Sequence, residues 1–188
     1  MEKKSSTRIL GIDPGTNILG FAVLEVKDQK MYILEIGVVK MSHFSEQPEK
    51  LKTIFERTRE IIKKYRPGNL AIEAPFYAKN IQSMLKLGRA QGVAIAAGIT
   101  AGLDITEYSP KKKKHSVTGN GIAPKDHVAA MLETIFHQKL QEEYFDATDA
   151  LATAVCHHFQ STSRLGQLKG KGGWKNFLNE NPDRHWKP

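Results

Sequence analysis

Three strand-like runs open the chain before any helical pattern begins. They cover residues 8–13, 19–26 and 31–40 and are rich in isoleucine, valine, phenylalanine and tyrosine, which favour β-strands. The connections PGTN and KDQK are short and carry turn residues and charges, as hairpin connections do. The chain therefore starts with an antiparallel meander, and any fold proposed for it must contain one.

From residue 51 onward the pattern changes to alternating helices and strands. Residues 51–65 carry apolar side chains at the spacing of one helical face until Pro67 and Gly68 end the helix. The next elements are a strand, a helix, a strand and two helices, at residues 69–73, 81–101, 104–108, 125–144 and 146–160. This order predicts an α/β fold with a mixed five-stranded sheet, whose first three strands are antiparallel and whose faces are flanked by helices.

Length and charge limit the class of protein. A chain of 188 residues suits one domain that buries about two thirds of its unfolded surface. Residues 1–160 carry the periodic apolar patterns, whereas residues 161–188 are basic and glycine-rich, so we expect a flexible tail there. The formal net charge of +8 favours a polyanionic partner but does not by itself identify one.

A single cysteine, Cys156, excludes an internal disulfide and a zinc site built from several cysteines, which suits a reducing cytoplasm. The segment MEKKSSTRIL has no long apolar core and does not resemble a signal peptide. The least polar helical stretch, residues 93–103, is well short of the roughly 20 residues that span a bilayer. We therefore expect a soluble, cytoplasmic protein without a membrane segment.

Two of the apolar strands end in an acid, and an unpaired charge beside a core is costly. Asp13 ends the first strand and Glu73 ends the fourth. If these strands are parallel neighbours, about 4.8 Å apart, the two carboxylates lie side by side and raise each other's pKa. A divalent cation between the two carboxylates would remove their electrostatic repulsion. Taken alone, Asp13 also suits an Asp-Pro-Gly turn, and Glu73 also suits an ion pair with an arginine.

Two further acids, Asp146 and Asp149, are spaced three residues apart and share one helix face. Taken alone, this stretch also resembles a helix N-terminus with a capping aspartate. The set of four carboxylates favours a metal site, because Mg²⁺ and Mn²⁺ prefer oxygen ligands. Two such ions about 3.5 to 4 Å apart can hold the attacking and leaving oxygens of a phosphodiester displacement.

Four stretches, in this order and spacing, resemble the RuvC family of bacterial Holliday junction resolvases. They are GIDPGTNILGFAVLE, IEAPFYAKN with LKLGRAQGVA, EYSPKKKKHSVTGNGIAPKDHVAAML, and DATDALATAV, and the resemblance covers about residues 8–160. It implies a ribonuclease H-like nuclease that works as a homodimer and uses magnesium to nick two opposed strands of a four-way DNA junction, leaving 5′-phosphate ends. It further implies roles in recombination and DNA repair, with the junction-binding and branch-migration proteins RuvA and RuvB as partners.

Carried over position by position, the resemblance assigns catalysis and metal binding to the four acids. They are Asp13, Glu73, Asp146 and Asp149, and they are expected to hold two Mg²⁺ ions per subunit, which Mn²⁺ could replace. The third of these positions varies between aspartate and histidine in related enzymes, and this chain has the aspartate.

The expected DNA contacts comprise two aromatic residues and a set of basic ones. One of Phe76 and Tyr77 suits a hydrophobic staple and the other suits stacking on an unpaired base, and the resemblance selects Phe76 for the stacking role. The resemblance also selects Lys114 and Lys125, although four consecutive lysines leave open which one contacts the scissile strand, and such a run also suits a solvated face. The full expected set is Phe76, Tyr77, Lys79, Arg89, Lys111, Lys112, Lys113, Lys114 and Lys125.

Two other stretches carry competing interpretations. The small residues of GRAQGVAIAAGITAG suit either close packing on the sheet of the same chain or a subunit interface. The stretch CHHF, residues 156–159, contains metal-ligating residue types, but consecutive residues of a helix point in different directions, and we expect no site there.

Three other functions share parts of this pattern. The GIDPGT stretch also resembles the phosphate loop of actin-like and Hsp70-like ATPases, but the chain is too short for two lobes and lacks a second glycine-rich loop. A junction-binding module without catalysis would not need acids at strand ends. A ribonuclease H acting on RNA–DNA hybrids shares the acid layout, and only the family resemblance argues against it.

Overall fold

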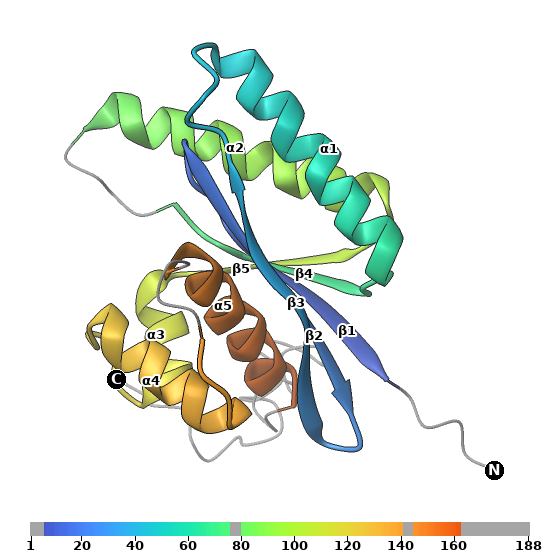
Figure 1. Cartoon of the computed structure of the whole chain (residues 1–188), viewed down its shortest axis with the longest axis vertical. Helices are drawn as coiled ribbons and strands as arrows, with labels where there is room; N and C mark the ends of the chain where they lie inside the picture. Colours follow the sequence, from blue (N-terminus) through green and yellow to red (C-terminus); the bar gives the residue numbers. More distant parts are fainter. Residues whose placement is uncertain (1–5, 76–79, 141–144, 163–188) are drawn as a thin grey trace, which may run out of the picture.

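The computed structural model describes residues 6–75, 80–140 and 145–162, which form five strands and five helices (Figure 1). In chain order these are β1 (Thr7–Asp13), β2 (Ile18–Lys27), β3 (Lys30–Lys40), α1 (Gln47–Tyr65), β4 (Asn69–Glu73), α2 (Ile81–Thr100), β5 (Asp104–Tyr108), α3 (Pro110–Thr118), α4 (Lys125–Phe136) and α5 (Phe145–Thr162).

The five strands form one mixed sheet in the order β3-β2-β1-β4-β5. β1, β2 and β3 are antiparallel neighbours, whereas β4 runs parallel to both β1 and β5. Parallel neighbours need a crossover connection, and α1 and α2 supply the two crossovers. The predicted α/β class, the five strands and the antiparallel start are confirmed.

The turn between β2 and β3 contains two residues in the left-handed region. Asp28 has a φ of 52° and Gln29 a φ of 64°, and Lys27 pairs with Lys30 across the turn. Positive φ at both central residues is the type I′ geometry, whose twist matches that of the flanking strands. The KDQK stretch is therefore a two-residue hairpin connection, as its sequence predicts.

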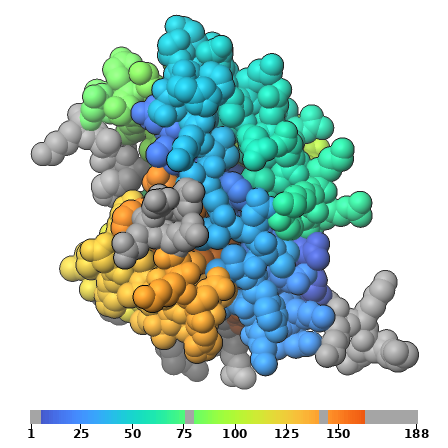
Figure 2. Space-filling view, in the orientation of Figure 1, coloured from blue at the N-terminus to red at the C-terminus, as the bar shows by residue number. Residues whose placement is uncertain are grey.

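Helices cover both faces of the sheet, α1 and α2 on one and α3, α4 and α5 on the other (Figure 1). Side chains alternate between these layers along β1: Ile9 belongs to the core under α5, and Leu10 and Ile12 belong to the core under α1 and α2. Burial on both faces explains why β1 is a continuous apolar run. Between the two helical layers, the β2–β3 hairpin reaches the surface (Figure 2).

One helix that the sequence analysis did not predict follows β5. The Ser109 side chain accepts a hydrogen bond from the Lys112 backbone N–H, Pro110 occupies the first turn, and Gly119 ends α3 with a φ of 74°. These are standard start and stop signals. They were missed because four consecutive lysines hide the apolar periodicity of a helix.

The helix predicted for residues 125–144 is too long, because α4 ends at Phe136. His137 adopts a left-handed φ of 52°, and its backbone N–H donates to the Glu133 carbonyl. The Glu133 side chain then accepts a hydrogen bond from the Leu140 backbone N–H at 2.9 Å. Without glycine or proline at this point, the sequence offers no local stop signal.

Two of the predicted boundaries lie in the C-terminal part of the chain. The last helix, α5, continues to Thr162, two residues beyond the predicted end. The flexible tail predicted from residue 161 lies, from residue 163 onward, outside the described residues and stays a prediction.

Within the described ranges, no helix has both the length and the apolar character needed to cross a lipid bilayer.

Candidate active site

Asp13 and Glu73 lie at the same edge of the sheet because β1 and β4 are parallel neighbours. The register pairs Ile12 with Ile72, so the next residue of each strand is the acid. Both acids are half-buried. The expected parallel pairing of these two strands is therefore present, and it brings the two acids to neighbouring positions.

The helix α5 brings the other two acids to this edge by crossing β1 and β2 at glycines. A Cβ atom placed on Gly11 would lie 2.2 Å from the Ala150 carbonyl oxygen, and one on Gly20 would lie 1.9 Å from the Asp146 carbonyl oxygen. Gly20 is the register partner of Asp13 in the β1–β2 ladder. Because only glycine allows this approach, the first turns of α5 sit directly beside the end of β1.

Two lysines form ion pairs with Glu73 and Asp149, and these residues come from four different elements. The Lys113 ammonium, from α3, forms ion pairs with Glu73 and with Asp149, and the distance from its Nζ to Asp149 Oδ1 is 2.9 Å. The Lys125 Nζ, from the start of α4, lies 2.6 Å from Asp149 Oδ2. The Lys113 side chain is only 3% exposed, whereas that of Lys125 is 58% exposed. Thus Glu73 pairs with a lysine rather than with the arginine considered from the sequence.

Burial and neighbouring charges shift the pKa values of Asp13 and Asp149 in opposite directions. Burial raises the pKa of Asp13 to about 7, and the neighbouring carboxylates of Glu73 and Asp149 add to this effect while Lys113 opposes it. Burial also disfavours the charge of Asp149, but Lys113 and Lys125 outweigh it and lower the pKa of Asp149. For Lys113, burial lowers the pKa, but the surrounding carboxylates raise it by more. The net pKa of Lys113 is therefore raised, and this lysine stays charged.

The fourth acid, Asp146, lies in the first turn of α5, where the helix dipole favours a negative charge. The helix-start interpretation and the site interpretation are therefore compatible for Asp146. For Asp149, each carboxylate oxygen is engaged by a lysine rather than by the start of its own helix. Asp146 is also close enough to Lys125 to raise the pKa of that lysine.

The donor set suits a hard divalent cation, because all four acids offer carboxylate oxygens. Among the residues that the structure describes, no three acids, histidines or cysteines are arranged to hold an ion as they stand. Instead, the Lys113 ammonium provides positive charge to Glu73 and Asp149. Burial, together with the carboxylates of Glu73 and Asp149, raises the pKa of Asp13 even though Lys113 and Lys125 oppose this shift. The residues therefore fit a divalent cation if the Lys113 ammonium gives way.

The expected DNA-binding residues are distributed around this site. Lys111 and Lys112 are exposed on α3, Lys114 is half-buried, and Arg89 is exposed on α2. The Lys112 ammonium lies 5.3 Å from the centre of the Tyr108 ring. The remaining three expected contacts, Phe76, Tyr77 and Lys79, lie outside the described residues, so these assignments stay predictions.

Gln91 supports the site from α2 and was not predicted from the sequence. This buried side chain donates to the Glu73 backbone carbonyl at 3.3 Å and to Glu107 Oε2 at 2.7 Å. It thereby ties the end of β4 to α2 and β5. The available signal was a lone amide among the small residues of GRAQGVA, a pattern that does not reveal where the amide points.

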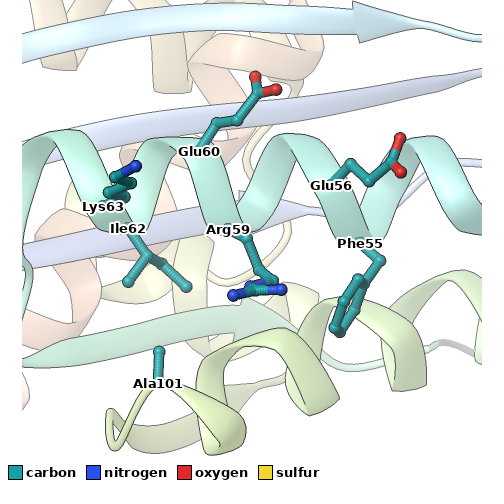
Figure 3. Close-up of a pocket in the computed structure, with 7 residues that line it drawn as sticks. All are labelled: Phe55, Glu56, Arg59, Glu60, Ile62, Lys63 and Ala101. Atoms are coloured by element: carbon teal, nitrogen blue, oxygen red, sulfur yellow. The ribbon is translucent and has the colours of Figure 1, made fainter.

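A separate pocket of about 600 Å³ lies between α1 and the end of α2 (Figure 3). Its wall carries the Arg59 guanidinium over the Phe55 ring at 5.7 Å, together with Glu56, Glu60 and Ala101. None of the four acids lines it. The pocket is therefore distinct from the acid site.

Sequence comparisons identify relatives over most of the chain. The family model described as "Crossover junction endodeoxyribonuclease RuvC" matches residues 9–157. The protein of that name from Cytophaga hutchinsonii is 51% identical over 177 residues, covering 94% of this chain and 86% of the relative. The one from Bacteroides fragilis is 48% identical over 178 residues, covering 94% of each chain.

Structure comparisons agree with this assignment. The structure titled "T. thermophilus RuvC in complex with Holliday junction substrate" aligns with a TM-score of 0.78 at 33% identity, covering 85% of this chain and 96% of that one. The yeast mitochondrial Holliday junction resolvase Ydc2 aligns with a TM-score of 0.60 at 16% identity, covering 93% of this chain and 86% of that one, which shows a shared fold only. The predicted resemblance and the ribonuclease H-like fold are confirmed. The chain belongs to the crossover junction endodeoxyribonuclease RuvC family.

Proposed function

We propose that this protein is a structure-selective endonuclease that resolves four-way (Holliday) DNA junctions in recombination and repair. It would do so by paired nicks that leave 5′-phosphate ends. The observation that carries the proposal is the convergence of carboxylates at one edge of the sheet. Glu73 of β4 and Asp149 of α5 share Lys113, and Asp13 of β1 is close enough to interact with the same group. Membership in the RuvC family supplies the substrate class.

The site would use Mg²⁺, with Mn²⁺ as a substitute, held by Asp13, Glu73, Asp146 and Asp149 at two ions per subunit. When bound, two such ions would activate a water for in-line attack and stabilise the leaving 3′-oxygen. The carboxylates support this role because they offer oxygen ligands and because burial and the nearby carboxylates of Glu73 and Asp149 disfavour a negative charge on Asp13 that a cation would stabilise.

The protein's own residues position and neutralise the reacting groups. Gln91 holds the backbone at Glu73, so this carboxylate projects from a fixed point at the end of β4. The Lys125 side chain is 58% exposed and would leave Asp149 to contact a phosphate of the DNA. Burial of Asp149 between the helices and the sheet limits access of bulk water to the carboxylates.

The surrounding basic residues would track the phosphates of the junction arms. Lys111, Lys112, Lys114 and Arg89 supply the charge, which positions DNA without reading its sequence. By family resemblance, Phe76 would stack on an unpaired base near the junction centre, with Tyr77 and Lys79 beside it.

The protein would act as a homodimer through the outer face of α2. Ile81, Leu85 and Ile99 are 67%, 49% and 61% exposed and share one helical stripe. Gly88 and Gly92 lie on the same stripe and have open space beside them. The opposite face of α2 packs on its own sheet, where Gly98 contacts Leu70 and Ile105. A two-fold axis through this stripe would set two sites against a two-fold-symmetric junction.

Family resemblance further supports RuvA and RuvB as partners and the cytoplasm as the compartment. The absence of a membrane-crossing helix among the described residues is consistent with that compartment.

The Asp13→Asn variant tests the function. We expect it to lose Mg²⁺-dependent cleavage of a synthetic four-way junction, because it removes a ligand charge. Junction binding should persist and should weaken steeply with added salt, because phosphate contacts release counterions. Linear duplex and RNA–DNA hybrid serve as competing substrates for the wild type. Retained cleavage in Asp13→Asn would refute the catalytic role, and preferential cleavage of the hybrid would favour a ribonuclease H activity.

A further inference from the structure

Of four consecutive lysines on α3, one points into the protein. Lys111 and Lys112 are exposed, Lys114 is half-buried, and Lys113 is buried. Successive helical residues are rotated by about 100°, so a run of lysines cannot all face one way. Val117, one turn further along, is also buried, which identifies the inward face of the helix. Lys113 therefore occupies a core-facing position.

The Lys113 ammonium engages carboxylates from two other elements at this position. It pairs with Glu73 at the end of β4 and with Asp149 in α5, and the charge of Asp13 is close enough to interact with it. A buried ammonium is tolerated only when it is paired in this way. The three acids are expected metal ligands, so Lys113 and a divalent cation require the same oxygens.

We propose that Lys113 is an internal counterion of the acid site, which holds Glu73 and Asp149 together in the metal-free protein and is displaced from them when a divalent cation binds. The inference rests on the proposed function, because it assumes that these acids take a metal. It assigns Lys113 a positioning role rather than a contact with DNA phosphate. Lys113 would therefore stabilise the metal-free fold and at the same time weaken metal binding.

The test compares Lys113→Met with Lys111→Met in the absence of DNA. Methionine has a similar length and an apolar end, so Lys113→Met removes mainly the charge. Lys111→Met removes the same charge from an exposed position on the same helix. Two quantities are measured for each protein: the thermal midpoint in EDTA, and the Mn²⁺ dissociation constant by isothermal titration calorimetry.

We expect opposite changes in the two quantities. Lys113→Met should lower the metal-free midpoint by several degrees, because the acids lose their counterion. It should tighten Mn²⁺ binding by about tenfold or more, because a like charge within a few ångströms of the ion is gone. Mn²⁺ should therefore raise the midpoint more in Lys113→Met than in the wild type. Lys111→Met should match the wild type in both quantities.

Other outcomes overturn the proposal. Weaker Mn²⁺ binding in Lys113→Met would indicate a structural lysine, and no change in either quantity together with weaker junction binding would indicate a phosphate contact. If the variant does not fold, ¹⁵N NMR of the wild-type lysine ammonium groups decides, because Mg²⁺ must shift the Lys113 signal and an unchanged signal at saturation refutes displacement. A wild type that neither binds Mn²⁺ nor cuts junctions would instead refute the proposed function.

Discussion

At the scale of single residues, the CHHF stretch shows how a polar group is accommodated inside this fold. His157 is buried in α5, and its Nδ1 lies 3.0 Å from the Tyr108 hydroxyl on β5. Burial lowers the pKa of His157, as does the neighbouring His158, while Asp104 opposes the shift. Burial also raises the pKa of Tyr108 to about 12. This histidine is therefore a neutral partner within the core.

A pH dependence of stability follows from the lowered pKa of His157. Below its ordinary value of 6.5 the unfolded chain takes up a proton that the folded protein does not, so the contribution of His157 to stability falls as pH falls. We expect the difference in unfolding free energy between wild type and His157→Gln to shrink by up to about 1.4 kcal/mol per pH unit below that value. Urea denaturation in EDTA from pH 7.5 to 5 measures it.

The comparison with His157→Gln is needed because Asp13 changes the unfolding free energy with pH in the opposite direction. The pKa of Asp13 is raised to about 7, so its contribution favours the folded state as pH falls. This contribution is common to both proteins and cancels in the difference. A difference that stays constant between pH 7.5 and 5 would contradict the assignment of His157 as a buried neutral group.

At the scale of elements, the approach of α5 to the sheet determines whether the site exists. The helix crosses β1 and β2 at Gly11 and Gly20, where no side chain separates the backbones. Asp146 and Asp149 stand in the first turns of the same helix. A small outward movement of α5 would therefore separate these acids from the strand that carries Asp13.

Gly20→Ala should disturb both stability and catalysis for this reason. Its Cβ would lie 1.9 Å from the Asp146 carbonyl oxygen, so the helix must shift. We expect a loss of about 2 to 3 kcal/mol in unfolding free energy and a marked loss of junction cleavage. The control is Gly68→Ala, whose Cβ would meet nothing within 4 Å and which should change stability by less than about 0.5 kcal/mol. Equal stabilities of the two variants would contradict the close packing.

At the scale of the whole molecule, the sheet separates two helical layers with different tasks. The layer of α3, α4 and α5 supplies both lysines and two of the acids to the site. The layer of α1 and α2 supplies Gln91 and the exposed apolar stripe. Because these surfaces lie on opposite sides of the sheet, pairing through α2 would leave the acids open to DNA (Figure 1).

Leu85→Glu should break the proposed dimer without unfolding the monomer. Leu85 is already 49% exposed, so the fold loses little when a charge replaces it, whereas a two-fold contact would place two such charges together. Light scattering should show the monomer mass, and junction cleavage should change from paired cuts to single nicks. Ile122→Glu, at a residue that is 82% exposed beyond α3, should leave the mass unchanged. An intact Leu85→Glu dimer would exclude this face as the interface.

The sequence by itself determined the features that depend on neighbouring residues. Alternation of strand residues, the turn at Asp28 and Gln29, and the apolar spacing of α1 are local, and they were enough to predict the α/β class and the mixed sheet. The acids at strand ends were also visible, since Asp13 and Glu73 each interrupt an apolar pattern. Order along the chain then made the family recognisable.

Only the tertiary structure decided how elements are rotated and where they touch. It selected Lys113 from four identical neighbours, gave Glu73 a lysine partner, placed Gln91 behind the site and ended α4 at Phe136. The rotation of a short helix and the end of a helix without a stop residue depend on contacts between segments far apart in the chain. Local sequence carries no record of such contacts, because their energies arise only when the layers pack together.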